Sequence, residues 1–255
     1  MRTVSLTTLA SASPDRLAAA LSGPPEIAAA WIAAAAENGI VEAQAIYGQI
    51  LLDGRGVARD PAAALTWFKH AANADHPMAM NMVGRCYEHG WGTAACASVA
   101  VYWFRLAARA GLDWGMYNYA TALALGNGVD ENRAEALAWF EKAAALGHAK
   151  SINLIGSFYE DGWVVEADPG TAFDRAFDHY RRAAVAGDFR GQFNYARCLA
   201  ACGRIEEALE WIARVPQTAT PAFIEKMRAH LATSPVAAFR AAASSLPSPF
   251  QESAS

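Results

Sequence analysis

The chain has 255 residues, of which 54% are hydrophobic and only 18% are charged, and its formal net charge is −4. That amount of apolar material is sufficient to order a fold, so wholesale disorder is excluded. Alanine is frequent and runs of β-branched residues are few, which favours helices over strands.

The distribution of charge and apolar residues also limits the partners. Nucleic-acid binding needs a basic patch, and the densest basic spot, Arg181-Arg182, has Asp178 and Asp188 close by. No segment approaches the roughly 20 apolar residues of a membrane span. We therefore expect no nucleic-acid partner and no membrane insertion, and we expect a monomer.

The N-terminal segment shows weak signals before the first clear helix. Residues 1–8 hold one positive charge and no apolar run long enough for a signal peptide, so we expect a cytoplasmic protein. We expect residues 1–12 to be flexible. A short helix should run from Ser13-Pro14-Asp15 to Leu21, and Gly23-Pro24-Pro25 should end it before the next helix. Residues 13–40 are then N-terminal capping helices.

A repeat of 36 residues follows, and it determines the fold class. Four tryptophans mark it, each with an alanine three residues before and an alanine pair four and five residues after; they are Trp31, Trp67, Trp103 and Trp139. A small residue marks the other helix of each unit, at Gly48, Gly84, Ala120 and Gly156. Six residues later a glycine should end that helix in the left-handed conformation, at Gly54, Gly90, Gly126 and Gly162.

The last two units depart from this period. In the fourth unit His179-Tyr180 takes the Trp-Phe place 40 residues after Trp139-Phe140, so four residues are added between Gly162 and Ala176. They predict either a longer loop or one added helical turn. A degenerate fifth unit has Ala196 at the small position and ends with Trp211-Ile212.

These motifs resemble the Sel1-like repeat family, a branch of the tetratricopeptide-type helical repeats. The pattern stands here as Gly48, then Gly54-Arg55-Gly56-Val57, then the block from Ala64 through Trp67-Phe68 to Ala71-Ala72. It stands again as Ala120, Gly126-Asn127-Gly128-Val129 and the block from Ala136 to Ala144. The resemblance implies an all-α fold, a right-handed α-α solenoid of about five helix pairs, with the repeat array at residues 41–215.

The C-terminal segment should cap the stack, because a linear array otherwise exposes an apolar face at its end. Thr220-Pro221 and Ser234-Pro235 each open a predicted helix, so residues 216–242 are C-terminal capping helices. Residues 243–255 are rich in Ser and Pro and should be a disordered tail.

No residue pattern indicates catalysis. The six histidines are spread along the chain without metal-ligand spacing, and the four cysteines form no CxxC pair, which favours a reducing compartment. Cys198 and Cys202 stand four residues apart on one helix, but small half-buried packing residues are the simpler interpretation. We therefore expect no catalytic residue, no metal site, no cofactor and no enzymatic activity.

A partner surface is predicted on the helix that carries the small residue, the first helix of each unit. Positions one before and three after the small residue form an apolar core stripe. A shift of two residues turns the helix by about 200°, nearly to its opposite face. We expect that face to line the concave side of the array. The candidate partner-binding residues there are Gln49, Asn81, Arg85, Glu88, Tyr117, Asn153, Ser157, Glu160, Phe193 and Arg197.

Two alternatives remain for this face. It is either a binding surface, with Asn and Arg donating to a peptide and aromatic residues packing on it, or a merely solvated helix face. Asn81 and Asn153 have a further alternative, since they can bond within the stack and tie neighbouring repeats together. The functional hypothesis is a non-catalytic scaffold or adaptor for a protein or peptide; the competing hypothesis is a regulatory subunit or inhibitor of one enzyme.

Overall fold

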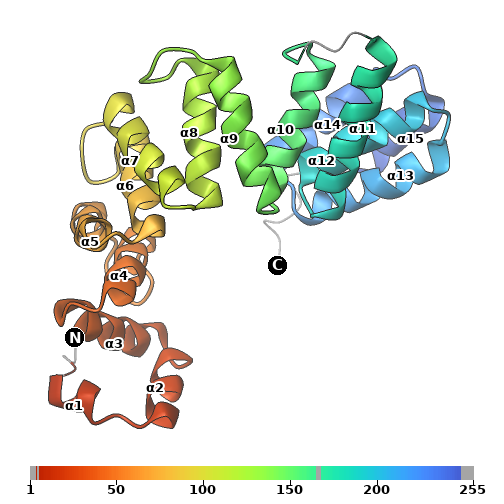
Figure 1. Ribbon diagram of the computed structural model, residues 1–255. Helices are drawn as coiled ribbons and strands as arrows, with labels where there is room; N and C mark the ends of the chain where they lie inside the picture. Colours follow the sequence, from red (N-terminus) through yellow and green to blue (C-terminus); the bar gives the residue numbers. More distant parts are fainter. Residues whose placement is uncertain (1–3, 5, 165–167, 248–255) are drawn as a thin grey trace. The chain divides into compact units, whose positions relative to one another are not determined.

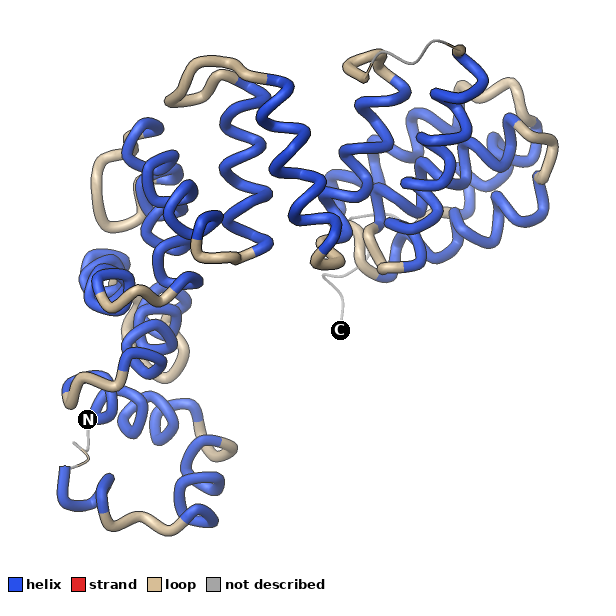
Figure 2. The backbone as a smooth tube through the Cα atoms, in the orientation of Figure 1, coloured by secondary structure: helices blue, strands red, loops and turns tan. Residues whose placement is uncertain are grey.

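The computed structural model describes residues 4, 6–164 and 168–247, and every regular element in these ranges is a helix (Figure 1, Figure 2). The predicted all-α class is confirmed. Contacts divide the chain into two compact units, residues 1–139 and 140–255, which are described separately. None of the described helices combines the length and the apolarity needed to cross a membrane.

Unit 1 holds the N-terminal helices and the first repeats. Its helices are α1 (Leu6–Ala10), α2 (Pro14–Leu21), α3 (Pro25–Glu37), α4 (Val41–Asp53), α5 (Pro61–Asn73), α6 (Pro77–His89), α7 (Ala97–Arg109) and α8 (Asp113–Leu125). The next helix, α9 (Arg133–Ala145), crosses the boundary between the units. Helices that follow one another pack together from α3 to α8, as the predicted helix pairs require.

Unit 2 holds the later repeats and the C-terminal cap. Its helices are α10 (Ala149–Glu160), α11 (Pro169–Val185), α12 (Phe189–Ala201), α13 (Ile205–Arg214), a 3₁₀ turn (Val215–Gln217), α14 (Pro221–Ala232) and α15 (Ala237–Ser245). Again α10 packs on α11, α11 on α12, α12 on α13 and α14 on α15.

The small residue of each repeat makes room for an aromatic ring. A Cβ added at Gly84 would lie 2.6 Å from the Cδ1 and Cε1 atoms of Phe104, and one at Gly48 would lie 2.7 Å from Phe68. Gly156 stands in the same relation to Tyr180, at 2.8 Å. These rings are at most 2% exposed, so the missing side chain lets the two helices of a repeat bury their largest apolar group between them.

The Gly-x-Gly loop uses its two glycines differently. The first ends the helix with positive φ, at +74° for Gly54 and +72° for Gly90, as predicted. The second has positive φ as well, but it also touches the preceding repeat: a Cβ at Gly92 would lie 2.2 Å from the carbonyl oxygen of Pro61. Gly56 meets Pro25 in the same way, at 2.3 Å. The second glycine therefore permits close approach between consecutive repeats.

The added residues of the fourth repeat extend a helix. α5, α7 and α9 each have 13 residues, whereas α11 has 17. Of the two alternatives, the added helical turn is confirmed. The loop before it also departs from the pattern, since Trp163 stacks on Phe158 at 4.5 Å with an interplanar angle of 3°.

Side chains cap several of the helices. Asp60 Oδ1 accepts hydrogen bonds from the N–H groups of Ala62 and Ala63 at 3.1 and 2.9 Å. Asp168 Oδ2 accepts from the N–H of Thr171, and this bond and others hold the pKa of the Asp168 carboxyl below its usual value.

Both ends of the chain are more ordered than we expected. Within residues 1–12 the structure contains α1, which packs against α3, so flexibility throughout that segment was wrong. At the other end α15 continues to Ser245, because Ala243 and Leu246 bury their side chains in the core of unit 2. The expected disorder from residue 243 was therefore wrong for the start of that segment, and residues 248–255 lie outside the described residues.

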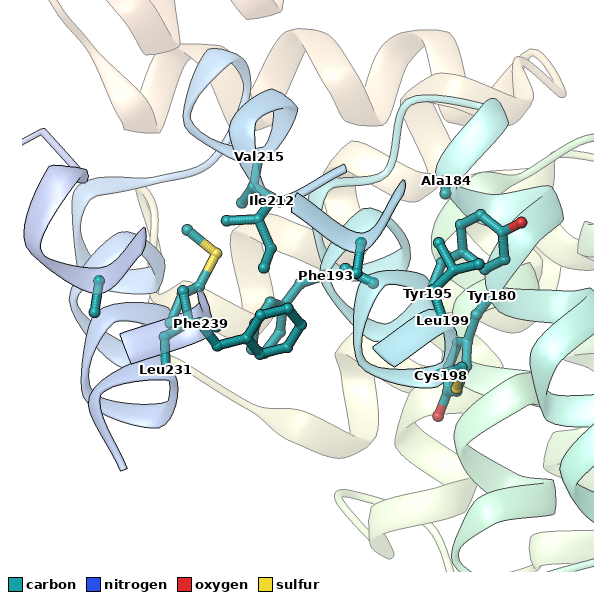
Figure 3. Close-up of a cluster of buried hydrophobic side chains, with 14 of the residues drawn as sticks. Tyr180, Ala184, Phe193, Tyr195, Cys198, Leu199, Ile212, Val215, Leu231 and Phe239 are labelled. Atoms are coloured by element: carbon teal, nitrogen blue, oxygen red, sulfur yellow. The ribbon is translucent and has the colours of Figure 1, made fainter. Parts of the chain in front are cut away.

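The core of unit 2 joins the last repeats to the cap. It includes Tyr180 and Leu199 of the repeats together with Leu231 and Phe239 of α14 and α15 (Figure 3). The C-terminal helices thus cover the apolar end of the array within this unit.

Candidate partner-binding surface

The first helices of consecutive repeats contact each other, α6 with α8 in unit 1 and α10 with α12 in unit 2. On each first helix, the side turned to solvent is formed by residues spaced at i, i+4, i+7 and i+11. Residues at equivalent positions of consecutive first helices form a row. One row is half-buried in every repeat and consists of Gln49, Arg85, Thr121, Ser157 and Arg197. We call the set of solvent-facing rows on α4, α6, α8, α10 and α12 the first-helix face, and it is considered separately within each unit.

Seven of the ten candidate residues are accessible on this face. Glu88 and Glu160 are exposed, and Gln49, Arg85, Tyr117, Ser157 and Arg197 are half-buried. The prediction that the remaining three are accessible was wrong: Asn81 is 3% exposed, Asn153 4% and Phe193 9%. Phe193 is buried because the cap covers it, with ring contacts to Phe223 at 6.0 Å and His230 at 5.4 Å.

The two buried asparagines link neighbouring repeats. Asn118 Nδ2 donates to Asn81 Oδ1 at 2.8 Å in unit 1, and Asn194 Nδ2 donates to Asn153 Oδ1 at 3.0 Å in unit 2. Each bond joins the first helix of one repeat to the first helix of the next. The alternative in which Asn81 and Asn153 bond within the stack is confirmed.

The N-terminal half of the predicted stripe lies beside a neighbouring helix. Asn81 and Asn153 lie against the next first helix, and the residue one position later, about 100° further round, lies toward the preceding first helix at Asn118 and Asn194. Sequence reasoning therefore missed Asn118 and Asn194. The available signal was their spacing, because each follows by one position the row that holds Asn81 and Asn153.

Exposed apolar side chains on unit 1 were also missed. Ile46 is 39% exposed on α4, Met78 40% on α6 and Trp114 38% on α8. Trp114 stands edge-to-face with Tyr117, with ring centroids 6.0 Å apart. Met78 and Trp114 lie 36 residues apart and so share one repeat position, but the equivalent residues of the adjoining repeats are Glu42 and Lys150, so a search for recurring residue types passes over them.

In unit 2 the two charged candidate residues, Arg197 and Glu160, form an ion pair with each other. Arg197 Nη2 donates to both carboxylate oxygens of Glu160, at 2.9 and 2.8 Å. Tyr180 donates its hydroxyl to Glu160 Oε2 at 2.6 Å. Burial, and then the bond to this carboxylate, raise the pKa of Tyr180 above its usual value. The carboxylate of Glu160 on α10 thus links α11 and α12 to its own helix through hydrogen bonds.

In unit 1 a cleft of about 400 Å³ opens between α4 and α6. Its walls are formed by Gln49, Leu52, Asp53, Arg59, Met82, Arg85 and Trp91. The guanidinium carbon of Arg85 lies 5.1 Å from the centre of the Trp91 ring, and the His89 ring lies 4.6 Å from the same tryptophan. Two of the predicted residues, Gln49 and Arg85, therefore belong to one concave feature.

The chemistry-bearing side chains do not converge elsewhere in the described ranges. No group of three or more His, Cys, Asp or Glu side chains in those ranges is placed to hold a metal ion. The four cysteines are free thiols. Burial raises the pKa of Cys86 and of Cys198 to about 11, so both remain protonated thiols at neutral pH.

Consecutive helix pairs, each with an aromatic ring over a small residue, define the class: this is an α-helical repeat protein. The Sel1 repeat model matches residues 41–76, 77–112, 115–148 and 149–188, more than half of the chain, and the chain belongs to the Sel1 repeat family. No curated protein matches it significantly.

Solved structures agree with this assignment. A Sel1 repeat protein from Oxalobacter formigenes is 27% identical with a TM-score of 0.74, covering 85% of this chain and 88% of that one. The protein c5321, a protective antigen present in uropathogenic Escherichia coli strains and displaying an SLR fold, is 23% identical with a TM-score of 0.67. The match covers 84% of this chain but only 47% of c5321, so this chain spans about half of its length.

A third structure is more distant. The immunity protein Pa5087 from Pseudomonas aeruginosa is 18% identical with a TM-score of 0.51, covering 80% of this chain and 79% of that one. At this identity, as for c5321, the likeness shows the fold alone. The solenoid fold predicted from the repeat is confirmed by the family and by these structures.

Proposed function

We propose that the chain is a non-catalytic scaffold or adaptor that binds a protein or peptide on the first-helix face, as a cytoplasmic monomer. Sel1 repeat solenoids are commonly protein-interaction scaffolds, and they are typically non-catalytic. A repeat array suits this role because its outer rows are fixed by the packing behind them, so little order is lost on binding.

One observation carries the proposal. In unit 1 the exposed Ile46, Met78 and Trp114 stand on the same three helices as the half-buried polar row of Gln49, Arg85 and Thr121. Aromatic and Met side chains beside Arg are the composition enriched at protein interfaces. Met78 and Trp114 occupy one repeat position on two helices that contact each other, and exposed apolar groups that gather on one face mark interaction sites, whereas singly scattered ones do not.

The test is binding of a purified partner, first identified by affinity capture, to variants of the face. Substitution of Met78 and Trp114 by Ser should weaken binding at least tenfold, because truncating central apolar anchors costs about 2 kcal/mol or more. The matched control is Val185→Ser on α11, where the side chain is 69% exposed but stands on a second helix. Asn81 and Asn153 are unsuitable targets, since their loss would disturb the packing of repeats.

Two measurements decide the outcome: binding by the variants, and the number and catalytic turnover of the partners. Binding that survives the Met78/Trp114 change and is lost in the Val185 control would contradict the proposal. A single partner bound one to one, whose catalytic turnover changes on binding, would identify the protein as a regulatory subunit or inhibitor. Several partners bound without change in turnover would identify a scaffold.

A further inference from the structure

The cleft between α4 and α6 holds more positive than negative charge. Arg59 and Arg85 both line it, and neither forms an ion pair with a carboxylate among the described residues. Arg59 donates its Nε–H to the carbonyl oxygen of Leu52 at 2.9 Å, and Arg85 lies over the Trp91 ring. The remaining guanidinium N–H groups are free to serve a ligand.

The arginines of this protein differ in whether a carboxylate neutralises them. Six other arginines form ion pairs with Asp or Glu at 2.6–3.5 Å; they are Arg55, Arg133, Arg181, Arg197, Arg204 and Arg228. In the cleft, two guanidinium groups without an ion pair stand beside one carboxylate, Asp53, which is already paired with Arg55. This is a local excess of positive charge, and an anion would complement it.

The one acidic residue of the cleft limits which anion fits. Asp53 Oδ1 already accepts a hydrogen bond from Gln49 Nε2 at 2.8 Å, and its Oδ2 lies 3.5 Å from Arg55. Its charge remains close to any ligand and would repel a doubly charged phosphate more than a singly charged group. A planar monoanion also matches the planar fork of a guanidinium.

The apolar wall strengthens such a contact. Leu52 is 7% exposed and Met82 8%, and Trp91 is partly buried beside them. An ion pair that is partly shielded from water gains more than one on an open surface.

We propose that this cleft binds a carboxylate of the partner, with Arg85 and Arg59 as its donors and Trp91 as its wall. The inference rests on the proposed function and specifies the partner as a peptide segment that presents an acidic side chain or a chain end. Both sources offer the same carboxylate group.

The experiment follows the indole N–H signal of Trp91 by NMR in the ¹⁵N-labelled full chain, assigned through its loss in Trp91→Phe. Four probes are titrated: N-acetylglutamate α-amide, N-acetylalanine, the neutral N-acetylglutamine amide, and inorganic phosphate. At least one of the two carboxylates should shift the signal saturably, with a Kd of about 1 mM, which corresponds to roughly 4 kcal/mol of binding free energy. The tighter of the two identifies the source as a side chain or a chain end.

Variants decide whether the arginines are responsible. Arg85→Gln should weaken carboxylate binding at least tenfold, while Arg181→Gln on unit 2, which removes an exposed arginine, should leave it unchanged. Arg59→Gln serves as the second variant if Arg85→Gln does not fold, as judged by thermal unfolding.

The inference is overturned if the neutral amide binds as well as the acids, if phosphate binds more tightly than both, or if binding survives in a folded Arg85→Gln chain. Loss of this site alone, with partner binding still dependent on Met78 and Trp114, would leave the proposed function standing. If the cleft binds carboxylates but partner binding does not depend on Met78 and Trp114, the carboxylate site stands and the proposed binding face is wrong.

Discussion

Gly90 and Gly92 offer a direct measure of what holds consecutive repeats together. Both have positive φ, +72° and +71°, so alanine is strained to the same extent at either position. Their surroundings differ. A Cβ at Gly90 has no atom nearer than 3.4 Å, whereas one at Gly92 would lie 2.2 Å from the carbonyl oxygen of Pro61 and 2.5 Å from its carbon.

The magnitudes follow from these distances. Left-handed backbone costs an L-residue about 1–2 kcal/mol, which is the whole expected cost of Gly90→Ala. At Gly92 the added methyl lies more than about 1 Å inside ordinary contact with a backbone that cannot rotate away. Displacing it should add about 1–3 kcal/mol. We therefore expect Gly92→Ala to be the more destabilising by that difference.

The assay is chemical and thermal unfolding of both variants followed by circular dichroism. A difference of about 1–3 kcal/mol corresponds to a gap of roughly 2–12 °C in Tm for a chain of this size. Because the two positions share one loop, any local unfolding affects both variants alike. Equal destabilisation would refute the reasoning, since it would mean that the contact between the second glycine and the preceding repeat does not set their spacing.

Two further predictions concern ionisable groups. Burial raises the pKa of Asp188, so its ionised form is disfavoured in the folded state, and its contribution to stability should be highest below pH 4 and fall as pH rises through the raised value. Asp188→Asn keeps the acceptor for the Gly191 N–H, bonded at 2.7 Å, and should match or exceed wild-type Tm at pH 7, with the advantage shrinking toward pH 4. Asp188→Ala loses that acceptor and should be about 1 kcal/mol less stable than Asp188→Asn throughout. Iodoacetamide at pH 7.5 should label Cys96, whose pKa is lowered by its bond to Ser98, well before Cys86 and Cys198; mass spectrometry of the native chain checks this, and equal rates would contradict it.

The sequence was sufficient to predict the fold because the residues that pack together within one repeat can be recognised from their spacing along the chain. An aromatic residue follows Gly48 and Gly84 by 20 positions and Gly156 by 24, since α11 is four residues longer, and the structure places that ring where the missing side chain would be. These contacts lie within one helix pair, so spacing along the chain is enough to infer them. The role of Gly92 was out of reach for the same reason, since its neighbour Pro61 belongs to the preceding repeat.

The candidate surface was predicted in part, and its error has a geometric cause. Counting from the core stripe places a residue on a helix to within about 100°, because one residue turns the helix by that angle. The count ignores which side of the helix the next repeat covers. Asn81 and Asn153 lie on that covered side, while Arg85 and Gln49, one turn further, remain accessible.

The asparagine pairs show how recurrence should be interpreted in a repeat protein. Asparagine is mildly unfavourable within a helix, so its return at Asn81 and Asn153 requires a compensating use, and the structure identifies that use as a bond to the next repeat. What recurs from unit to unit serves the stacking that every unit shares. Met78 and Trp114 share one repeat position, but the equivalent residues in the adjoining repeats are Glu42 and Lys150, so an apolar residue is not required there for stacking. Ile46, Met78 and Trp114 are nevertheless exposed despite being apolar. Side chains of that kind contribute little to stacking, which is the physical reason to seek the partner of this protein there and not among the recurring residues.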